Sequence, residues 1–198
     1  MIKDTDIKVI GLCGVAQSGK DTFCKHAIKL FADQNIKCMR VSFADALKAD
    51  VDEFLIDKVG ISAFTTKLKE KTLIRDFLVA YGTKLMRKID ESCWINKAGI
   101  LIEENINNNV LSIITDIRYP NELKWVQESL KGKCLHISRI NKGAYIEPAN
   151  REEAEHNPVL QKLADSRLNW ATLDDEDTLE WIVGDELNSL LQLTEAVL

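Results

Sequence analysis

The fold of this chain is decided by the stretch Gly14-Val15-Ala16-Gln17-Ser18-Gly19-Lys20-Asp21-Thr22. An apolar run, residues 7–13, precedes it, and a helical pattern with apolar residues on one side follows it. Glycine lets a backbone bend around an anion and turn successive N–H groups inward, and the start of a helix adds partial positive charge. Strand, glycine loop and helix in this order predict a phosphate-binding loop rather than a chance pairing of Gly and Lys.

Within this loop, Lys20 supplies a point charge that can reach the outer phosphates of a nucleotide. Asp21 stands where such loops usually carry Ser or Thr, and Thr22 follows one position later. Two interpretations of Asp21 stay open: a hard oxygen ligand for Mg²⁺, or a cap of the helix N-terminus. The predicted contacts to ATP are Gly14, Gln17, Ser18, Gly19, Lys20, Asp21 and Thr22.

Size and charge exclude several classes of protein. A chain of 198 residues suits one domain with a substantial core. Its 26 Lys and Arg against 31 Asp and Glu give a net charge of −5, so we expect no binding of a nucleic acid polymer. No apolar run approaches the ~20 residues of a membrane span, and the polar first six residues do not resemble a signal peptide. We therefore expect a cytoplasmic protein.

The five cysteines follow no metal-site spacing. They form no Cys-x-x-Cys pair, and Cys13, Cys38 and Cys134 lie in or beside apolar strand patterns. Buried, reduced thiols are the favoured interpretation, with zinc binding or a catalytic thiol as the alternatives.

Apolar strand patterns alternate with helical patterns along the chain. Strands are expected at residues 7–13, 38–43, 110–116, 134–140 and 168–171, and helices at 20–34, 44–59, 67–89, 92–106, 120–130 and 178–193. This order predicts a P-loop NTPase-type three-layer α/β/α fold with a five-stranded parallel sheet. More helix than one crossover needs stands at 44–106, which we interpret as a helical acceptor-binding insertion in a single domain. The polar stretch 139–158 is interpreted as a lid, in the form of a mobile lid or surface loop.

Asp116 ends the third apolar strand, where a phosphate-loop protein is expected to hold Mg²⁺ through a carboxylate. Arg118 follows it and can grip a phosphate with two N–H groups. Glu122 lies one helical turn further on, where it can orient Arg118 or accept a bond from a sugar or base. A surface Arg–Glu pair is the alternative.

Other charged and aromatic residues mark the insertion and the lid. In the insertion these are Lys48, Arg75, Arg87 and Trp94, with an interruption of the helix at Tyr81-Gly82-Thr83 that indicates a bend or a close backbone approach. Singly, each charge is more often solvated and Trp94 more often part of a core. In the lid, Arg139 or Arg151 can stabilise the charge that develops during phosphoryl transfer. No Ser/His/Asp arrangement or metal-ligand cluster stands out.

These residues together resemble the bacteriophage deoxynucleoside monophosphate kinases, which are similar in overall fold to adenylate kinase and other nucleoside monophosphate kinases. The loop match is Gly14-Val15 and Ser18-Gly19-Lys20-Asp21-Thr22. Further matches span most of the chain in order: Arg75 with Gly82-Thr83, Trp94, Ile114-Thr115-Asp116-Ile117-Arg118 with Glu122, and His136-Ile137-Ser138-Arg139. The loop motif is shared by several small-molecule kinases. Arg75 followed by Gly82-Thr83, and Asp116-x-Arg118-x-x-x-Glu122, are more specific.

The resemblance implies Mg²⁺-dependent transfer of the γ-phosphoryl group of ATP to a deoxynucleoside monophosphate. It implies catalytic roles for Lys20, Arg75, Arg118 and Arg139, and metal ligation by Asp21 and Asp116. It places the acceptor against Lys48, Arg75, Gly82, Thr83, Trp94, Arg118 and Glu122. The alternatives are another small-molecule kinase, similar to dephospho-CoA kinase, and a non-catalytic nucleotide-binding regulator. The partners are then small nucleotides, a homodimer stays open, and a phage-encoded protein is expected in the host cytoplasm.

Overall fold

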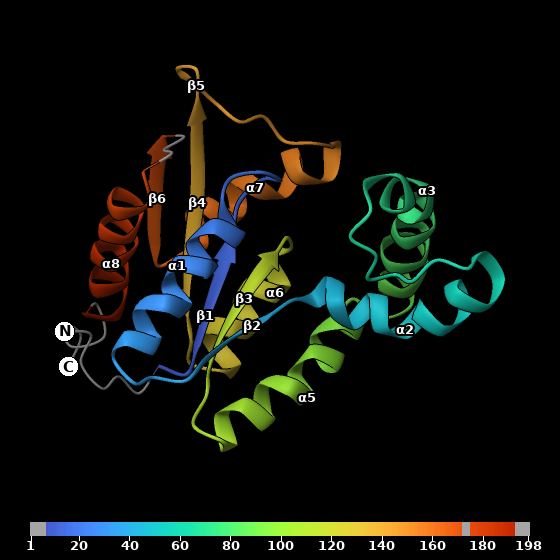
Figure 1. Ribbon diagram of the computed structural model, residues 1–198, viewed down its shortest axis with the longest axis horizontal. Helices are drawn as coiled ribbons and strands as arrows, with labels where there is room; N and C mark the ends of the chain where they lie inside the picture. The colour runs from blue at the N-terminus through green and yellow to red at the C-terminus, as the bar shows by residue number, and fades with distance from the viewer. Residues whose placement is uncertain (1–6, 172–174, 193–198) are drawn as a thin grey trace. The chain divides into compact units, whose positions relative to one another are not determined.

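The apolar runs form a sheet in which parallel pairing dominates. The computed structural model describes residues 7–171 and 175–192 (Figure 1). Five strands neighbour one another in parallel, in the order β2 (Cys38–Val41), β3 (Leu111–Ile117), β1 (Val9–Cys13), β4 (Lys133–Asn141) and β6 (Ser166–Ala171). Every residue of β1 is buried, as expected of a central parallel strand that is covered on both faces.

The sheet has a sixth strand that the sequence did not predict. Strand β5 (Ala144–Tyr145) pairs antiparallel with the end of β4. Lys142 and Gly143 connect the two strands with φ values of 51° and 83°. Two positive φ values are the pattern of a tight two-residue hairpin turn, which needs no apolar alternation to form. The expectation of five strands therefore holds for the parallel part of the sheet and is one strand short for the whole.

Helices α1 (Lys20–Asp33) and α8 (Glu176–Gln192) cover one face of the sheet. They pack on alternate residues of β1 and β4, namely Ile10, Leu12, Leu135 and Ile137, in the main hydrophobic core. The sequence placed the last helix at 178–193, of which residue 193 lies outside the described residues. The expected polar start, residues 1–6, lies outside them too.

The opposite face is covered by α6 (Pro120–Lys124), the π-helical turn η2 (Trp125–Ser129) and α7 (Arg151–Leu163). Gly11 of β1 points to this side, where an added Cβ would lie 2.4 Å from Ile117 Cδ1 and 3.0 Å from Cys134 Sγ. Helices on both faces confirm the expected three-layer α/β/α arrangement.

Helix α7 corrects the interpretation of 139–158 as a loop. The two prolines and many charges of this stretch concealed a helix start, at which the Asn150 side chain accepts a hydrogen bond from the Glu153 N–H over 2.9 Å. Pro158 lies inside the helix, which continues to Leu163.

The chain divides into two compact units, and each is described by itself. The first is Met1–Val41 with Glu103–Leu198, and the second is Ser42–Ile102. The second contains α2 (Phe43–Val59), α3 (Leu68–Val79), the π-helix η1 (Ala80–Met86), α4 (Arg87–Ile89) and the first part of α5 (Cys93–Asn107). It nearly coincides with the insertion 44–106 expected from the sequence.

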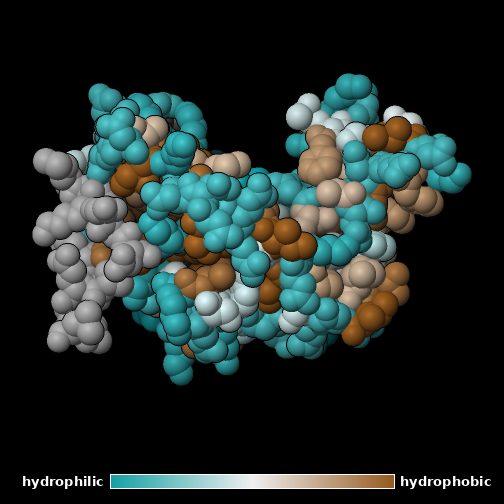
Figure 2. All heavy atoms as spheres, turned by 90° about the horizontal axis from the view of Figure 1, so that it is seen from below, coloured by the Kyte–Doolittle hydropathy of each residue, from teal (hydrophilic) through white to brown (hydrophobic). Residues whose placement is uncertain are grey.

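A small apolar core holds the second unit together. Its buried members are Val51, Leu55, Ala63 and Ile74. Large hydrophobic side chains also lie exposed on this unit, including Leu68, Leu73 and Ile89, and hydrophobic residues are visible on its surface in Figure 2. Among the described residues, no helix is both long and apolar enough to cross a membrane.

The loop that follows β1 depends on Gly14, which yields a first prediction. Gly14 has φ 132°, and an added Cβ would lie 2.2 Å from the carbonyl oxygen of Ile137 in β4. Because this neighbour is backbone and cannot rotate away, we expect Gly14→Ala to lower the free energy of unfolding by about 2–4 kcal/mol, measured by urea denaturation.

Gly143→Ala is the matched control for this prediction. Gly143 also has a positive φ, 83°, but an added Cβ meets nothing within 4 Å. It should cost only the conformational strain of about 1–2 kcal/mol. Equal losses in the two variants would show that the contact with β4 does not constrain the loop.

Candidate phosphate-binding site

The glycine loop is held in one shape by its own turn and by strand β6. Gly14, Gln17 and Gly19 have φ values of 132°, 64° and 99°, and the Ser18 N–H donates to the Val15 carbonyl over 3.2 Å. The buried indole of Trp170 in β6 donates to the Ser18 carbonyl over 2.9 Å. Its ring lies so close to Gly19 that an added Cβ would be 2.4 Å from Cζ2. The strand–loop–helix context that the sequence predicted is therefore confirmed.

Lys20 places its ammonium inside this loop. Its Nζ donates to the carbonyl oxygens of Gly14 at 2.9 Å and Val15 at 2.7 Å, and it lies 3.4 Å from Ser18 Oγ. Burial lowers the pKa of Lys20, and the positive charge of Arg118 lowers it further. A cation held this way, beside backbone N–H groups at the start of α1, is suited to bind a phosphate group.

Glu153 of α7 is a residue of this site that sequence reasoning missed. One oxygen of its carboxylate accepts the Ala16 N–H at 3.2 Å and the Ala149 N–H at 3.0 Å. Its other oxygen lies 3.7 Å from Arg118 Nη1, and the Glu153 side chain is only 9% exposed. A carboxylate therefore contacts an N–H group of the loop. The only sequence signal for this residue was the helix-start spacing of Asn150 and Glu153.

Asp21 and Thr22 lie in the first turn of α1, beyond the N-cap residue Gly19. The helix cap is thus Gly19, so the interpretation of Asp21 as the cap is wrong. The Asp21 carboxylate is 83% exposed and lies 3.5 Å from Arg40 Nε, while Thr22 is half-buried. The role of Asp21 as a metal ligand stays a prediction.

The carboxyl ends of β1 and β3 bring a second group of predicted residues to the loop. Ile117 is the register partner of Cys13, the last residue of β1, so Asp116 and Arg118 lie beside the point where the loop begins. Glu122 is buried and accepts the backbone N–H groups of Arg118 at 2.8 Å and Tyr119 at 3.1 Å. Glu122 therefore fixes the backbone at Arg118, and its predicted contact with the acceptor stays untested.

Strand β4 carries two further residues of the resemblance. Arg139 is half-buried, and its backbone carbonyl accepts the Ile146 N–H over 2.9 Å in the turn towards α7. His136 is buried, and its Nε2 lies 2.9 Å from Asn157 Oδ1 of α7. Burial lowers the pKa of His136, so the neutral ring joins α7 to the sheet. Neither Arg139 nor Arg151, the exposed first residue of α7, is singled out as the lid arginine.

The other predicted acceptor residues all belong to the second unit. Gly82 lies in η1 at a close approach, because an added Cβ would be 1.9 Å from Leu47 Cδ1 of α2. Trp94 is 4% exposed and donates its indole N–H to the Gly82 carbonyl over 3.2 Å. Lys48 lies 3.1 Å from Asp45 Oδ1. Thr83 is half-buried, and Arg75 is exposed on α3.

These placements support packing roles for Gly82 and Trp94. The acceptor contacts predicted for Lys48, Arg75, Gly82, Thr83 and Trp94 stay predictions.

The cysteines are free, with four buried and Cys38 half-buried. Burial raises the pKa of Cys13 and of Cys38 to about 12. These thiols are therefore protonated at neutral pH, which favours a packing role over catalysis.

Comparison with known proteins identifies likenesses of fold. No protein-family model and no curated protein matches the chain. Similar solved structures include dephospho-CoA kinase from Campylobacter jejuni, with 14% identity over 94% of this chain and 98% of that chain and a TM-score of 0.48. Shikimate kinase from Aquifex aeolicus has 17% identity over 94% and 98%, with a TM-score of 0.45. APS kinase from Mycobacterium tuberculosis, in complex with AMPPNP and APS, has 10% identity over 96% and 98%, with a TM-score of 0.39.

The fold and the loop define an α/β protein with a phosphate-binding-loop geometry.

The position of Glu153 yields a second prediction. Its negative charge would repel a phosphate at the loop, and its carboxylate already uses the Ala16 N–H and lies near Arg118. We expect Glu153→Gln to bind ATP about threefold to tenfold more tightly, because the amide keeps the shape and removes the negative charge. Isothermal titration at fixed ionic strength measures this.

Glu152→Gln is the matched control, since Glu152 is an exposed carboxylate in the same first turn of α7. It removes the same helix-dipole interaction and should leave ATP affinity unchanged. Unchanged or weaker binding by Glu153→Gln would show that the carboxylate does not compete with phosphate.

Proposed function

We propose that this protein is a kinase that transfers the γ-phosphoryl group of ATP to a deoxynucleoside 5′-monophosphate and so forms the diphosphate. The observation that carries the proposal is the ammonium of Lys20 held inside a strand–glycine loop–helix, with Asp116 and Arg118 at the adjoining strand end. Phosphoryl transfer needs positioning and charge stabilisation more than covalent chemistry, and these groups supply both.

Each residue has a distinct part in this proposal. The loop N–H groups and Lys20 bind the phosphates of ATP, and Arg118 grips a phosphate of donor or acceptor with its guanidinium. Arg139 shields the transferring group, and α7, which contacts the loop through Glu153, would help to exclude water when a nucleotide is bound. No general base is required, because the acceptor phosphate dianion is itself a nucleophile.

The donor chemistry of the site fits Mg²⁺. Asp21 and Asp116 offer hard carboxylate oxygens, which this ion prefers. When bound there, Mg²⁺ would neutralise charge on the phosphate oxygens.

The choice of acceptor rests on the second unit and on the spaced motifs shared with the phage kinases. The unit Ser42–Ile102 contains Lys48, Arg75, Gly82, Thr83 and Trp94, and thus most of the residues that the resemblance assigns to the acceptor. It also carries a stack of aromatic rings, with Phe54 and Phe77 at 5.8 Å and 19° and Phe77 and Tyr81 at 6.2 Å and 14°. Exposed aromatic faces such as that of Phe54 suit contact with a nucleobase.

A coupled assay of ADP release tests the acceptor class. The protein with ATP and Mg²⁺ is offered each of the four deoxynucleoside monophosphates, the corresponding ribonucleotides, dephospho-CoA, shikimate and adenosine phosphosulfate. We expect a deoxynucleoside monophosphate to stimulate ADP release most strongly and to appear as its diphosphate.

Two results would overturn the proposal. Stimulation by dephospho-CoA or another non-nucleotide acceptor alone would keep the kinase class and reject the substrate. ATP binding without stimulation by any acceptor would indicate a nucleotide-binding regulator.

The loop lysine gives a separate prediction. Lys20→Ala should lower turnover at least about a thousandfold, because the positive charge that stabilises the phosphates during transfer is lost. The circular dichroism spectrum should stay unchanged. Lys25→Ala, on the same helix and with a 69% exposed side chain, is the control and should retain turnover. Near-normal turnover by a folded Lys20→Ala variant would reject the role assigned to this loop.

A further inference from the structure

The buried side chain of His26 lies at the contact between α1 and α8, and its Nδ1 lacks a hydrogen bond. The residue is 2% exposed, and its Nδ1 makes no hydrogen bond. Among the buried side-chain nitrogens and oxygens of the described residues, the same is true only of Thr115 Oγ1. A buried polar atom without a hydrogen-bond partner costs free energy, so a ligand bound at this nitrogen would be stabilising.

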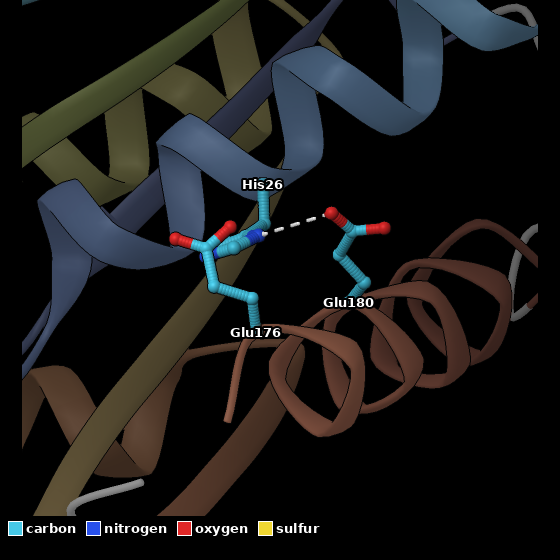
Figure 3. Close-up of side chains that lie close together, drawn as sticks. All are labelled: His26, Glu176 and Glu180. Carbon is cyan, nitrogen blue, oxygen red and sulfur yellow. Dashed lines mark ion pairs between the residues drawn. The ribbon is translucent and has the colours of Figure 1, made fainter. Parts of the chain in front are cut away.

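Two carboxylates of α8 face this imidazole. Figure 3 shows Glu176 and Glu180, one helical turn apart, with their carboxylates beside the ring of His26. Glu180 Oε1 lies 3.9 Å from Nδ1, beyond hydrogen-bond reach. The ligand atoms that the three residues offer all lie within 4.8 Å of one another.

We infer that His26, Glu176 and Glu180 form a binding site for a divalent transition metal ion, of which Zn²⁺ is the type. Bonds of about 2.0–2.2 Å in a tetrahedral site separate the ligand atoms by about 3.4 Å, so the three groups need to close by about 1 Å. Glu176 can make this adjustment because its side chain is 65% exposed. One water completes a fourth position.

The ligand set selects the class of metal. An imidazole nitrogen with two carboxylates suits Zn²⁺ and similar late transition metals, whereas Mg²⁺ and Ca²⁺ favour sites built from oxygen alone. The carboxylates already interact with Lys25 and Lys29, but both lysine side chains are more than half exposed. The Lys25–Glu176 pair is exposed on both sides and therefore weak, and the 57% exposed side chain of Lys29 can move away from Glu180 Oε1 when a metal ion binds.

Such an ion would join the C-terminal helix to the helix that begins with the phosphate-binding loop. His26 lies about two turns beyond Lys20 in α1, on the side that packs against α8. The site is separate from the nucleotide loop, and no step of the proposed phosphoryl transfer passes through it. Its consequence is stability of the α1–α8 contact.

The test uses the full chain, freed of metal with EDTA and then transferred to chelator-free buffer. Titration with Zn²⁺ should show one saturable site per chain, and the midpoint of thermal unfolding should rise by about 5–10 °C at a Zn²⁺ concentration of a hundred times Kd. Mg²⁺ should cause no comparable shift. Co²⁺ should give the visible absorption of a low-coordinate site.

The variant Glu176→Gln/Glu180→Gln removes both ligand charges without burying new groups, and should weaken Zn²⁺ binding at least a hundredfold and abolish the thermal shift. Asp185→Asn removes an exposed carboxylate from the same helix and should bind Zn²⁺ as the wild type does. Equal Zn²⁺ affinity in the double variant, as expected if cysteines bound the ion, would overturn the assignment. So would the absence of one-site binding, or an equal thermal shift with Mg²⁺.

Discussion

The loop between β1 and α1 can exist only because two of its positions carry no side chain. At Gly14 the backbone lies against the carbonyl of Ile137, and at Gly19 it lies against the ring of Trp170. Each contact leaves no room for a Cβ, and each residue also has a positive φ. The loop is thereby pressed against β4 and β6, and Trp170 adds a hydrogen bond to Ser18. The position of Lys20, and with it the proposed chemistry, follows from this packing.

The same loop links the site to the element that covers it. Glu153 of α7 accepts a hydrogen bond from the loop and lies near Arg118, while Asn157 of the same helix holds His136 of β4. A nucleotide phosphate bound at the loop would need the same hydrogen-bond donors as the Glu153 carboxylate. Phosphate binding, as proposed, would therefore be coupled to the contacts of α7, and this supports the lid interpretation with a physical reason that its polar composition alone did not provide.

The start and the middle of α1 differ in how their buried polar groups are paired. At its start, the ammonium of Lys20 is satisfied by loop carbonyls, and the helix end favours an anion. Further along, His26 faces two carboxylates of α8 with its Nδ1 unsatisfied. One helix thus borders both proposed sites, which have opposite preferences, the first for phosphate and the second for a cation.

Much of the fold followed from local patterns in the sequence. The spacing of glycines and lysine between an apolar run and a helical pattern determined the loop, and the five parallel strands follow from short apolar runs, because both signals are local. The close approach expected at Gly82 was also confirmed. Helix α7 was missed because Pro158 and many charged residues concealed the Asn150 cap. Strand β5 was missed because the two-residue turn before it has no periodicity.

What only the tertiary structure decided depends on residues that are distant in the chain. The contacts of Trp170 with Ser18, of Glu153 with Ala16 and of His26 with Glu180 join positions more than 130 residues apart, and no local pattern encodes such pairs. The sequence alone indicated which residue types are suited to bind phosphate, because that chemistry needs only a short loop. The tertiary fold decided which carboxylates meet the loop and the buried imidazole, because that depends on how helices pack on the sheet.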